Sequence, residues 1–145
     1  MDEKKNKRDL SEFYGIYNTT FDFIERNYGY DELVSYWEYM SKEYFSLLIK
    51  DAKKRGTEAF KQYWLESVED DEIEYDMEIE PDRFQLNIES CSAIDFLNKD
   101  KHYPMFDKYC EHCRVVNSKI AALSGFEYEV DYDQKKGKCR HIFKK

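Results

Sequence analysis

The stretch IEYDMEIEPDRFQLNI, residues 73–88, decides the fold class. Apolar side chains occupy every second position on both sides of Pro81-Asp82, and charged or polar residues fill the positions between them. This alternation is typical of strands with one buried face, and a Pro-Asp pair between two such runs favours a turn. The stretch therefore predicts a β-hairpin.

Upstream of the hairpin, apolar residues recur at helical spacing instead. The pattern predicts three helices, which cover about residues 10–28, 31–55 and 57–68. Asp9 and Glu12 resemble a capping box at the start of the first helix. Gly56 suits the left-handed position that follows the end of the second helix, and Thr57 suits the N-cap of the third.

Downstream of the hairpin, the sequence predicts one more helix and two more strands. The helix begins near Pro104 and ends at Gly125, and the strands cover about residues 126–132 and 139–143. The outer faces of the first and third strands are acidic and that of the fourth is basic, so cross-strand charge pairing predicts the strand order 2-1-4-3.

These elements define an α+β fold for a single domain, residues 1–145. A helical N-terminal half, about residues 10–68, is expected to pack on a four-stranded antiparallel sheet. The sheet and the remaining helix occupy about residues 73–143, with that helix between two hairpins.

Composition limits the kinds of partner. A net charge of −8 disfavours non-specific binding to nucleic acid or to an anionic membrane, and no apolar run is long enough to cross a bilayer. The charged N-terminus lacks the apolar core of a signal peptide, so a cytoplasmic location is expected. In that compartment the four cysteines are expected to be thiols or metal ligands and not disulfides. The composition leaves the oligomeric state open.

All four cysteines and all three histidines follow residue 90. Cys110 and Cys113 are three residues apart on the last predicted helix, so both should face the sheet, whereas His112 should lie at the helix flank. Cys139 and His141 should share the inner face of the last strand, because side chains alternate along a strand.

Cys91 follows the second strand, so three elements could deliver these groups to one pocket. Three interpretations remain open. The cysteines could be inert buried residues; Cys91, Cys110, Cys113, Cys139 and His141 could hold zinc or another divalent metal; or a thiol could be reactive. In the last case His141 is the best candidate for the base, because it shares a face with Cys139.

Several short motifs resemble the L-2-amino-thiazoline-4-carboxylic acid hydrolase family. They are Cys91-Ser92, Tyr109-Cys110, Gly125-Phe126 and the closing run Gly137-Lys138-Cys139-Arg140-His141-Ile142-Phe143. Members of the family often have Pro where this chain has Ser92, and His112-Cys113 has no counterpart in the pattern.

The resemblance implies hydrolysis of a C–N or C–S bond in a small cyclic amidine, a thiazoline carboxylate. Cys91, Cys110 and Cys139 would be the catalytic residues, with His141 as the acid/base. The C-terminal arrangement is also similar to vinyl-reductase-like small-molecule sensing domains. That similarity implies an alternative, a non-enzymatic module that binds a small ligand or a metal through the same cysteines.

Overall fold

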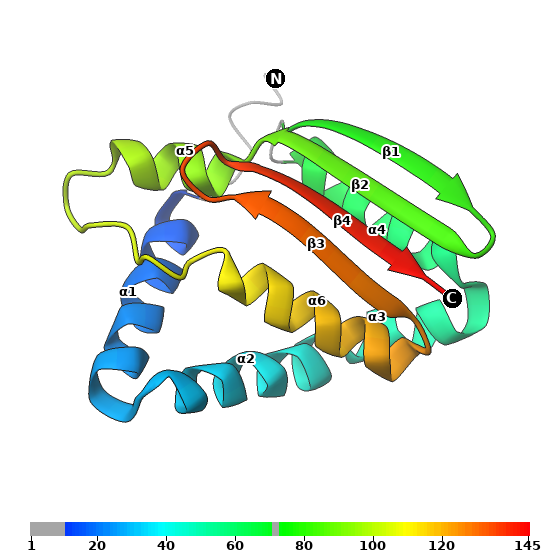
Figure 1. The fold of residues 1–145 in the computed structure, drawn as a ribbon, viewed down its shortest axis with the longest axis horizontal. Helices are drawn as coiled ribbons and strands as arrows, with labels where there is room; N and C mark the ends of the chain where they lie inside the picture. The colour runs from blue at the N-terminus through cyan, green and yellow to red at the C-terminus, as the bar shows by residue number, and fades with distance from the viewer. Residues whose placement is uncertain (1–10, 71–72) are drawn as a thin grey trace, which may run out of the picture.

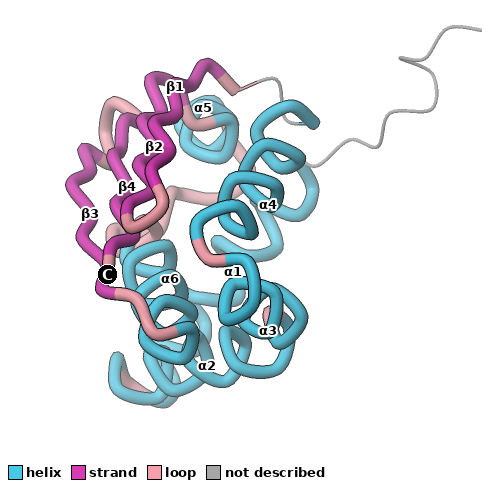
Figure 2. The backbone as a smooth tube through the Cα atoms, turned by 90° about the vertical axis from the view of Figure 1, so that its right-hand side faces the viewer, coloured by secondary structure: helices cyan, strands magenta, loops and turns pink. Residues whose placement is uncertain are grey.

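The computed structural model describes residues 11–70 and 73–145, which form two layers. One layer is a four-stranded antiparallel sheet, and the helices cover one face of it (Figures 1 and 2). The elements in chain order are α1 (Ser11–Tyr28), α2 (Tyr30–Tyr44), α3 (Ser46–Arg55), α4 (Thr57–Asp70), β1 (Glu74–Glu80), β2 (Arg83–Ser90), α5 (Ser92–Lys99), α6 (Glu111–Ser124), β3 (Glu127–Asp133) and β4 (Lys138–Lys144). The α+β architecture predicted from the sequence is confirmed.

The strand order is β1-β2-β4-β3, so the predicted order 2-1-4-3 is wrong. The β3–β4 pairing was predicted correctly, but β4 lies beside β2 and not beside β1. Burial explains the difference, because Phe84 and Leu86 of β2 are fully buried whereas the inward side chains of β1 are only half-buried. Exposed charge pairs contribute too little free energy to outweigh the burial of an apolar strand face.

Stacked phenylalanines join the sheet to the helical layer. The Phe60 ring of α4 lies 4.3 Å from the Phe143 ring of β4, measured between ring centroids, and 5.1 Å from the Phe126 ring. Phe60 and Phe143 are both fully buried. The core therefore extends from the inner face of the sheet through α4 into the helical layer, where it includes Phe21, Leu33 and Trp37, and the outer face of the sheet is left to solvent.

The helices differ from the predicted ones in three respects. The second predicted helix is broken at Phe45 (φ −96°, ψ 19°) into α2 and α3. The eight-residue helix α5, directly after Cys91, was not predicted at all. The last helix begins at Glu111 and not near Pro104.

The predicted C-terminal ends of the helices agree with the structure more closely than the predicted N-terminal starts. Gly56 and Gly125 both have the positive φ expected after a helix. Thr57 is the first residue of α4, and its hydroxyl donates a hydrogen bond to the Glu80 carbonyl oxygen (2.8 Å), which ties this helix to the end of β1. The proposed Asp9–Glu12 capping box involves a residue outside the described ones.

The segment between α5 and α6 is held against α1 by a buried amide. The Nδ2 atom of Asn18 donates to the Pro104 carbonyl oxygen (2.9 Å), and its Oδ1 atom accepts from the Phe106 N–H (2.7 Å). The hydroxyls of Tyr14 and Ser92 also share a hydrogen bond of 2.9 Å, which joins α1 to α5. The N-terminal helix thereby fixes the segment that leads into α6.

None of the helices described here combines the length and the apolar character that a bilayer span requires.

Candidate functional site

A cavity of about 160 Å³ lies between the inner face of the β3–β4 hairpin, the first turn of α6, the start of α5 and α1. Its walls include all four cysteines and two of the three histidines, which are Cys91, Cys110, Cys113, Cys139, His112 and His141. Cys91, Cys110, Cys139 and His141, which were predicted to converge on one pocket with Cys113 as a near neighbour, all line this cavity, and so does Cys113. His112 is the member that was not expected.

Cys91 and Cys110 reach the cavity as the residues that precede helices. Cys91 is the N-cap of α5, and its N–H donates to the Gly137 carbonyl oxygen (2.8 Å) in the β3–β4 turn. Cys110 is the N-cap of α6, and its N–H donates to Gln134 Oε1 (2.9 Å). The prediction that the last helix begins near Pro104, which would place Cys110 within it, is therefore wrong, because residues 104–110 are not α-helical.

Cys139 and His141 lie on the inner face of β4, as strand alternation predicted. The Cys139 Sγ atom is 3.2 Å from Nε2 of His141, and Nδ1 of that ring shares a hydrogen bond of 2.6 Å with the Tyr128 hydroxyl. The imidazole also stacks on the indole of Trp64, with 5.5 Å between ring centroids. His141 is 2% exposed and is thus held on three sides.

His112 and Cys113 form a second thiol–imidazole pair, on α6. The expectation that His112 lies at the helix flank is wrong, because α6 packs against α2 and α3 as well as against the sheet and buries side chains in both directions. Nδ1 of His112 contacts the Tyr109 carbonyl oxygen, which can only accept, so Nδ1 carries the proton. Nε2 then holds the free lone pair and faces Cys113 Sγ at 3.6 Å.

Burial keeps both imidazoles neutral near pH 7. It lowers the pKa of His112 and of His141 to about 4, because the charged form of a side chain is disfavoured away from water. The rings of Phe21, Trp37 and Tyr109 surround His112 and provide no negative charge to oppose this effect.

The four thiols are neutral for the same reason. Burial raises the pKa of Cys91 to about 11 and that of Cys113 to about 12. Burial also raises the pKa of Cys110 and of Cys139 well above the ordinary value, and the neighbouring thiols add to the shift in both. The position of Cys110 at the start of α6 does not offset this desolvation.

Charged side chains occur at one end of the cavity. Among the described residues that line it, only Asp133 and Lys138 are charged, and they are cross-strand partners at the β3–β4 turn. Both are exposed. The interior therefore offers a ligand aromatic and aliphatic surface, neutral thiols and neutral imidazoles.

The side chains that line the cavity do not fit a metal ion. Within residues 11–70 and 73–145, no group of three or more Cys, His, Asp or Glu side chains is arranged to hold one. A tetrahedral zinc site needs three or four such donors around one point. In this structure the described donors lie close together only in pairs of one thiol and one imidazole, Cys139 with His141 and Cys113 with His112.

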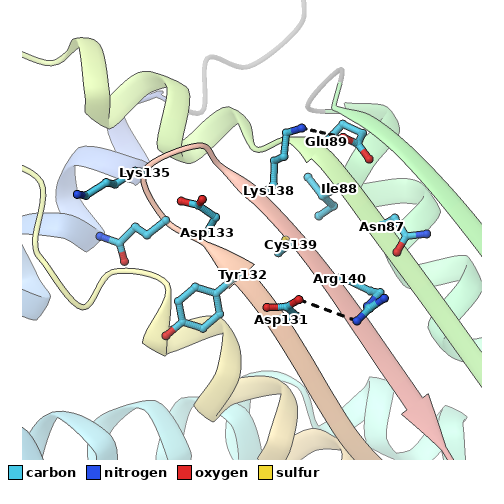
Figure 3. Close-up of a pocket in the computed structure, with 11 residues that line it drawn as sticks. Asn87, Ile88, Glu89, Asp131, Tyr132, Asp133, Lys135, Lys138, Cys139 and Arg140 are labelled. Atoms are coloured by element: carbon cyan, nitrogen blue, oxygen red, sulfur yellow. Dashed lines mark ion pairs between the residues drawn. The ribbon is translucent and has the colours of Figure 1, made fainter.

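A second, open groove lies on the outer face of the sheet (Figure 3). Four of its charged side chains form ion pairs, between Lys138 and Glu89 (3.4 Å) and between Arg140 and Asp131 (3.9 Å). All four are more than half exposed, so water and salt screen these charges. The inner cavity is the better candidate site, because it is enclosed and its groups are held in place.

Two contributors to the site could not be identified from cysteine and histidine spacing. Tyr128 lies in the strand predicted over about residues 126–132, and the predicted pairing of that strand with β4 was a signal that it could contact His141. Tyr17 of α1 lines the cavity from the helical layer, and its place in an apolar helical stripe gave no sign of this.

Comparison with family models, with curated proteins and with solved structures finds no match for this chain.

Proposed function

We propose that the protein is a small-molecule-binding domain whose inner cavity takes one uncharged ring-sized ligand. The observation that carries this proposal is the lining of the cavity, in which only the exposed Asp133 and Lys138 are charged among the described residues, and the thiols and imidazoles are shielded from water and neutral. An unpaired ionic group loses several kcal/mol when it moves from water into such surroundings, so an uncharged ligand is favoured.

The size of the cavity supports a single ring. A cavity of about 150 Å³ with aliphatic and aromatic walls is large enough for benzene, and the cavity here is about 160 Å³. The thiol of Cys139, the imidazole of His141 and the hydroxyl of Tyr14 supply uncharged hydrogen-bonding groups that would orient a polar substituent.

Three ligands of equal ring size test the proposal. Titration calorimetry with benzyl alcohol, benzoate and benzylammonium should show binding of the alcohol, with both ions at least roughly 100-fold weaker. Val130→Phe, which fills the cavity from β3, should abolish binding of the alcohol. Val34→Phe, the same change on α2 outside this cavity, is the matched control and should leave binding intact. Binding of benzoate in preference to the alcohol would contradict the proposal.

A second candidate function is hydrolysis of a small cyclic amidine such as a thiazoline carboxylate. The hydrogen-bonded chain from Cys139 through His141 to Tyr128 favours it, because an oriented neutral imidazole can accept a proton from an attacking thiol or water. The raised pKa of Cys139 opposes it, since the thiolate is the nucleophilic form.

Turnover decides between the two candidates. The wild-type protein is assayed with L-2-amino-thiazoline-4-carboxylate, and hydrolysis that disappears in both Cys139→Ala and His141→Asn but persists in Val34→Phe would favour the hydrolase. Tight binding of benzyl alcohol without turnover would favour the binding domain.

A further inference from the structure

A second cavity of about 160 Å³ lies directly beyond the first, on the helical side of α6. It is enclosed by α1, α4, α6 and the break between α2 and α3, and its lining residues are Tyr17, Met40, Tyr44, Phe45, Tyr63, Trp64, His112, Cys113, Val116 and Asn117. Three of these, Tyr17, His112 and Cys113, also line the first cavity. The two cavities are therefore separated by a partition one side chain thick.

The two rings of the partition are held differently: polar contacts hold His112, whereas ring packing holds Tyr17. His112 is fixed by its contact with the Tyr109 carbonyl oxygen and by the thiol of Cys113. Among the described residues, Tyr17 is held by ring packing alone, with its ring centroid 5.6 Å from that of Phe21 and 6.4 Å from that of His112, and it is 37% exposed. Its hydroxyl makes no hydrogen bond within the described part of the chain, so rotation of this side chain breaks none.

The second cavity equals the first in size, and its described lining contains no charged residue. Burial raises the pKa of Tyr63 to about 12, as expected away from water. The amide of Asn117 is already engaged, because its Nδ2 atom donates to the Cys113 carbonyl oxygen (2.8 Å). The space therefore suits a second uncharged ring, and it reaches the surface at Tyr44, which is 78% exposed.

We propose that the two cavities form one bipartite site for an uncharged ligand with two rings joined by a short linker, with Tyr17 as the movable partition. This inference rests on the proposed function, since the first ring would occupy the cavity assigned there. The second ring would lie among Met40, Tyr63 and Val116, and the linker would pass Tyr17 and Cys113.

The test compares benzyl alcohol with 4-benzylbenzyl alcohol, which adds one ring through one methylene. Calorimetry on the wild-type chain should give one two-ring molecule per protein, bound about 10- to 100-fold tighter than the one-ring alcohol. Val116→Phe fills the second cavity and should remove this gain while changing the affinity for benzyl alcohol by less than about twofold. Val130→Phe, the same change in the first cavity, should weaken both ligands.

Two further variants keep the test decisive if Val116→Phe does not fold. Met40→Phe fills the second cavity from another helix and should have the same effect, and Tyr17→Ala removes the partition and should preserve or increase the gain from the second ring. If benzyl alcohol binds and the second ring adds no affinity, the bipartite site is refuted and the proposed function stands. Binding of neither alcohol refutes both, and a gain that persists in Val116→Phe and Met40→Phe also refutes the bipartite site.

Discussion

Titratable side chains alternate between the two faces of β4, and the two faces differ in their exposure to water. On the inner face, Cys139 is half-buried and His141 is buried, and the loss of contact with water shifts the pKa of each toward its neutral form. On the outer face, Lys138 and Arg140 are exposed and form ion pairs with acids of the neighbouring strands. Neighbours in the chain thus alternate between a face shielded from water and a face exposed to it. The inner face is where a change of side chain or of protonation should matter.

The largest difference between the two faces should appear in truncations to alanine at adjacent positions. Phe143→Ala removes a fully buried ring that stacks on Phe60, and it should lower the free energy of unfolding by about 3–5 kcal/mol. Ile142→Ala, on the half-buried outer face, should lower it by less than about 1.5 kcal/mol. Urea denaturation followed by circular dichroism measures both, and equal losses would remove the distinction between the faces.

Acid should destabilise the protein through its two buried histidines. Each has a folded-state pKa of about 4 against an ordinary value of 6.5, so the unfolded state binds more protons between these values. The stabilisation is complete above pH 6.5 and should fall by roughly 3 kcal/mol per histidine by pH 4. Urea titrations at several pH values should show a flatter dependence in His141→Gln, whereas exposed His102→Gln should match the wild type.

The thiols should react slowly while the chain is folded. For Cys91, a pKa of about 11 in place of 9 lowers the thiolate fraction near pH 8 about 100-fold. A colorimetric thiol reagent should therefore label four cysteines rapidly in urea and all four slowly without it. Rapid labelling of one thiol in the folded protein would show that the inner face activates a nucleophile, which would strengthen the hydrolase candidate.

A smaller effect is expected at Trp37, where the inner layer contains an unsatisfied donor. This indole is fully buried, and its Nε1–H has no hydrogen-bond partner in the described structure. Trp37→Phe removes that donor and also leaves a void, and because the two effects oppose each other the net loss should stay below about 2 kcal/mol. Thermal denaturation can measure it, with Phe21→Ala as the comparison that removes ring packing alone.

The smallest effect is expected for the ion pairs of the outer face. Arg140→Ala and Asp131→Ala, alone and together, should each change the free energy of unfolding by less than about 1 kcal/mol, with a coupling below about 0.5 kcal/mol. A larger coupling in a double-mutant cycle would show that the outer groove is more rigid than its exposure implies.

Local patterns in the sequence predicted the local structure. The period of two in residues 73–88 predicted the hairpin, and the same rule placed Cys139 and His141 on one face, because strand alternation depends only on the backbone. The strand order could not be obtained this way. The order depends on which strand is buried most fully, and β2 lies beside β4 because Phe84 and Leu86 are fully buried there. Surface charge predicted β1 as the neighbour of β4 instead.

The candidate site was only partly predictable for a related reason. Helical periodicity assigns one buried face, but α6 is covered by the sheet and by α2 and α3, so His112 was wrongly assigned to the flank. Cys110 was placed inside a helix because Pro104 is a common first residue, whereas the Asn18 amide holds that segment in a non-helical path. Both errors come from contacts between residues more than 50 positions apart in the chain.

The same Asn18 clamp has a consequence for the order of folding. It joins positions 88 residues apart, and the Tyr14–Ser92 bond that supports the same wall spans 78 residues. Closing such long loops is entropically costly, so contacts of this kind form late in the folding of small domains. The sheet hairpins can pair early, and we expect the cavity to be completed only when α1 docks. Under mild destabilisation the cavity wall at residues 104–110 should therefore open before the sheet does. Amide hydrogen exchange should detect this as faster exchange at residues 104–110 than in the strands.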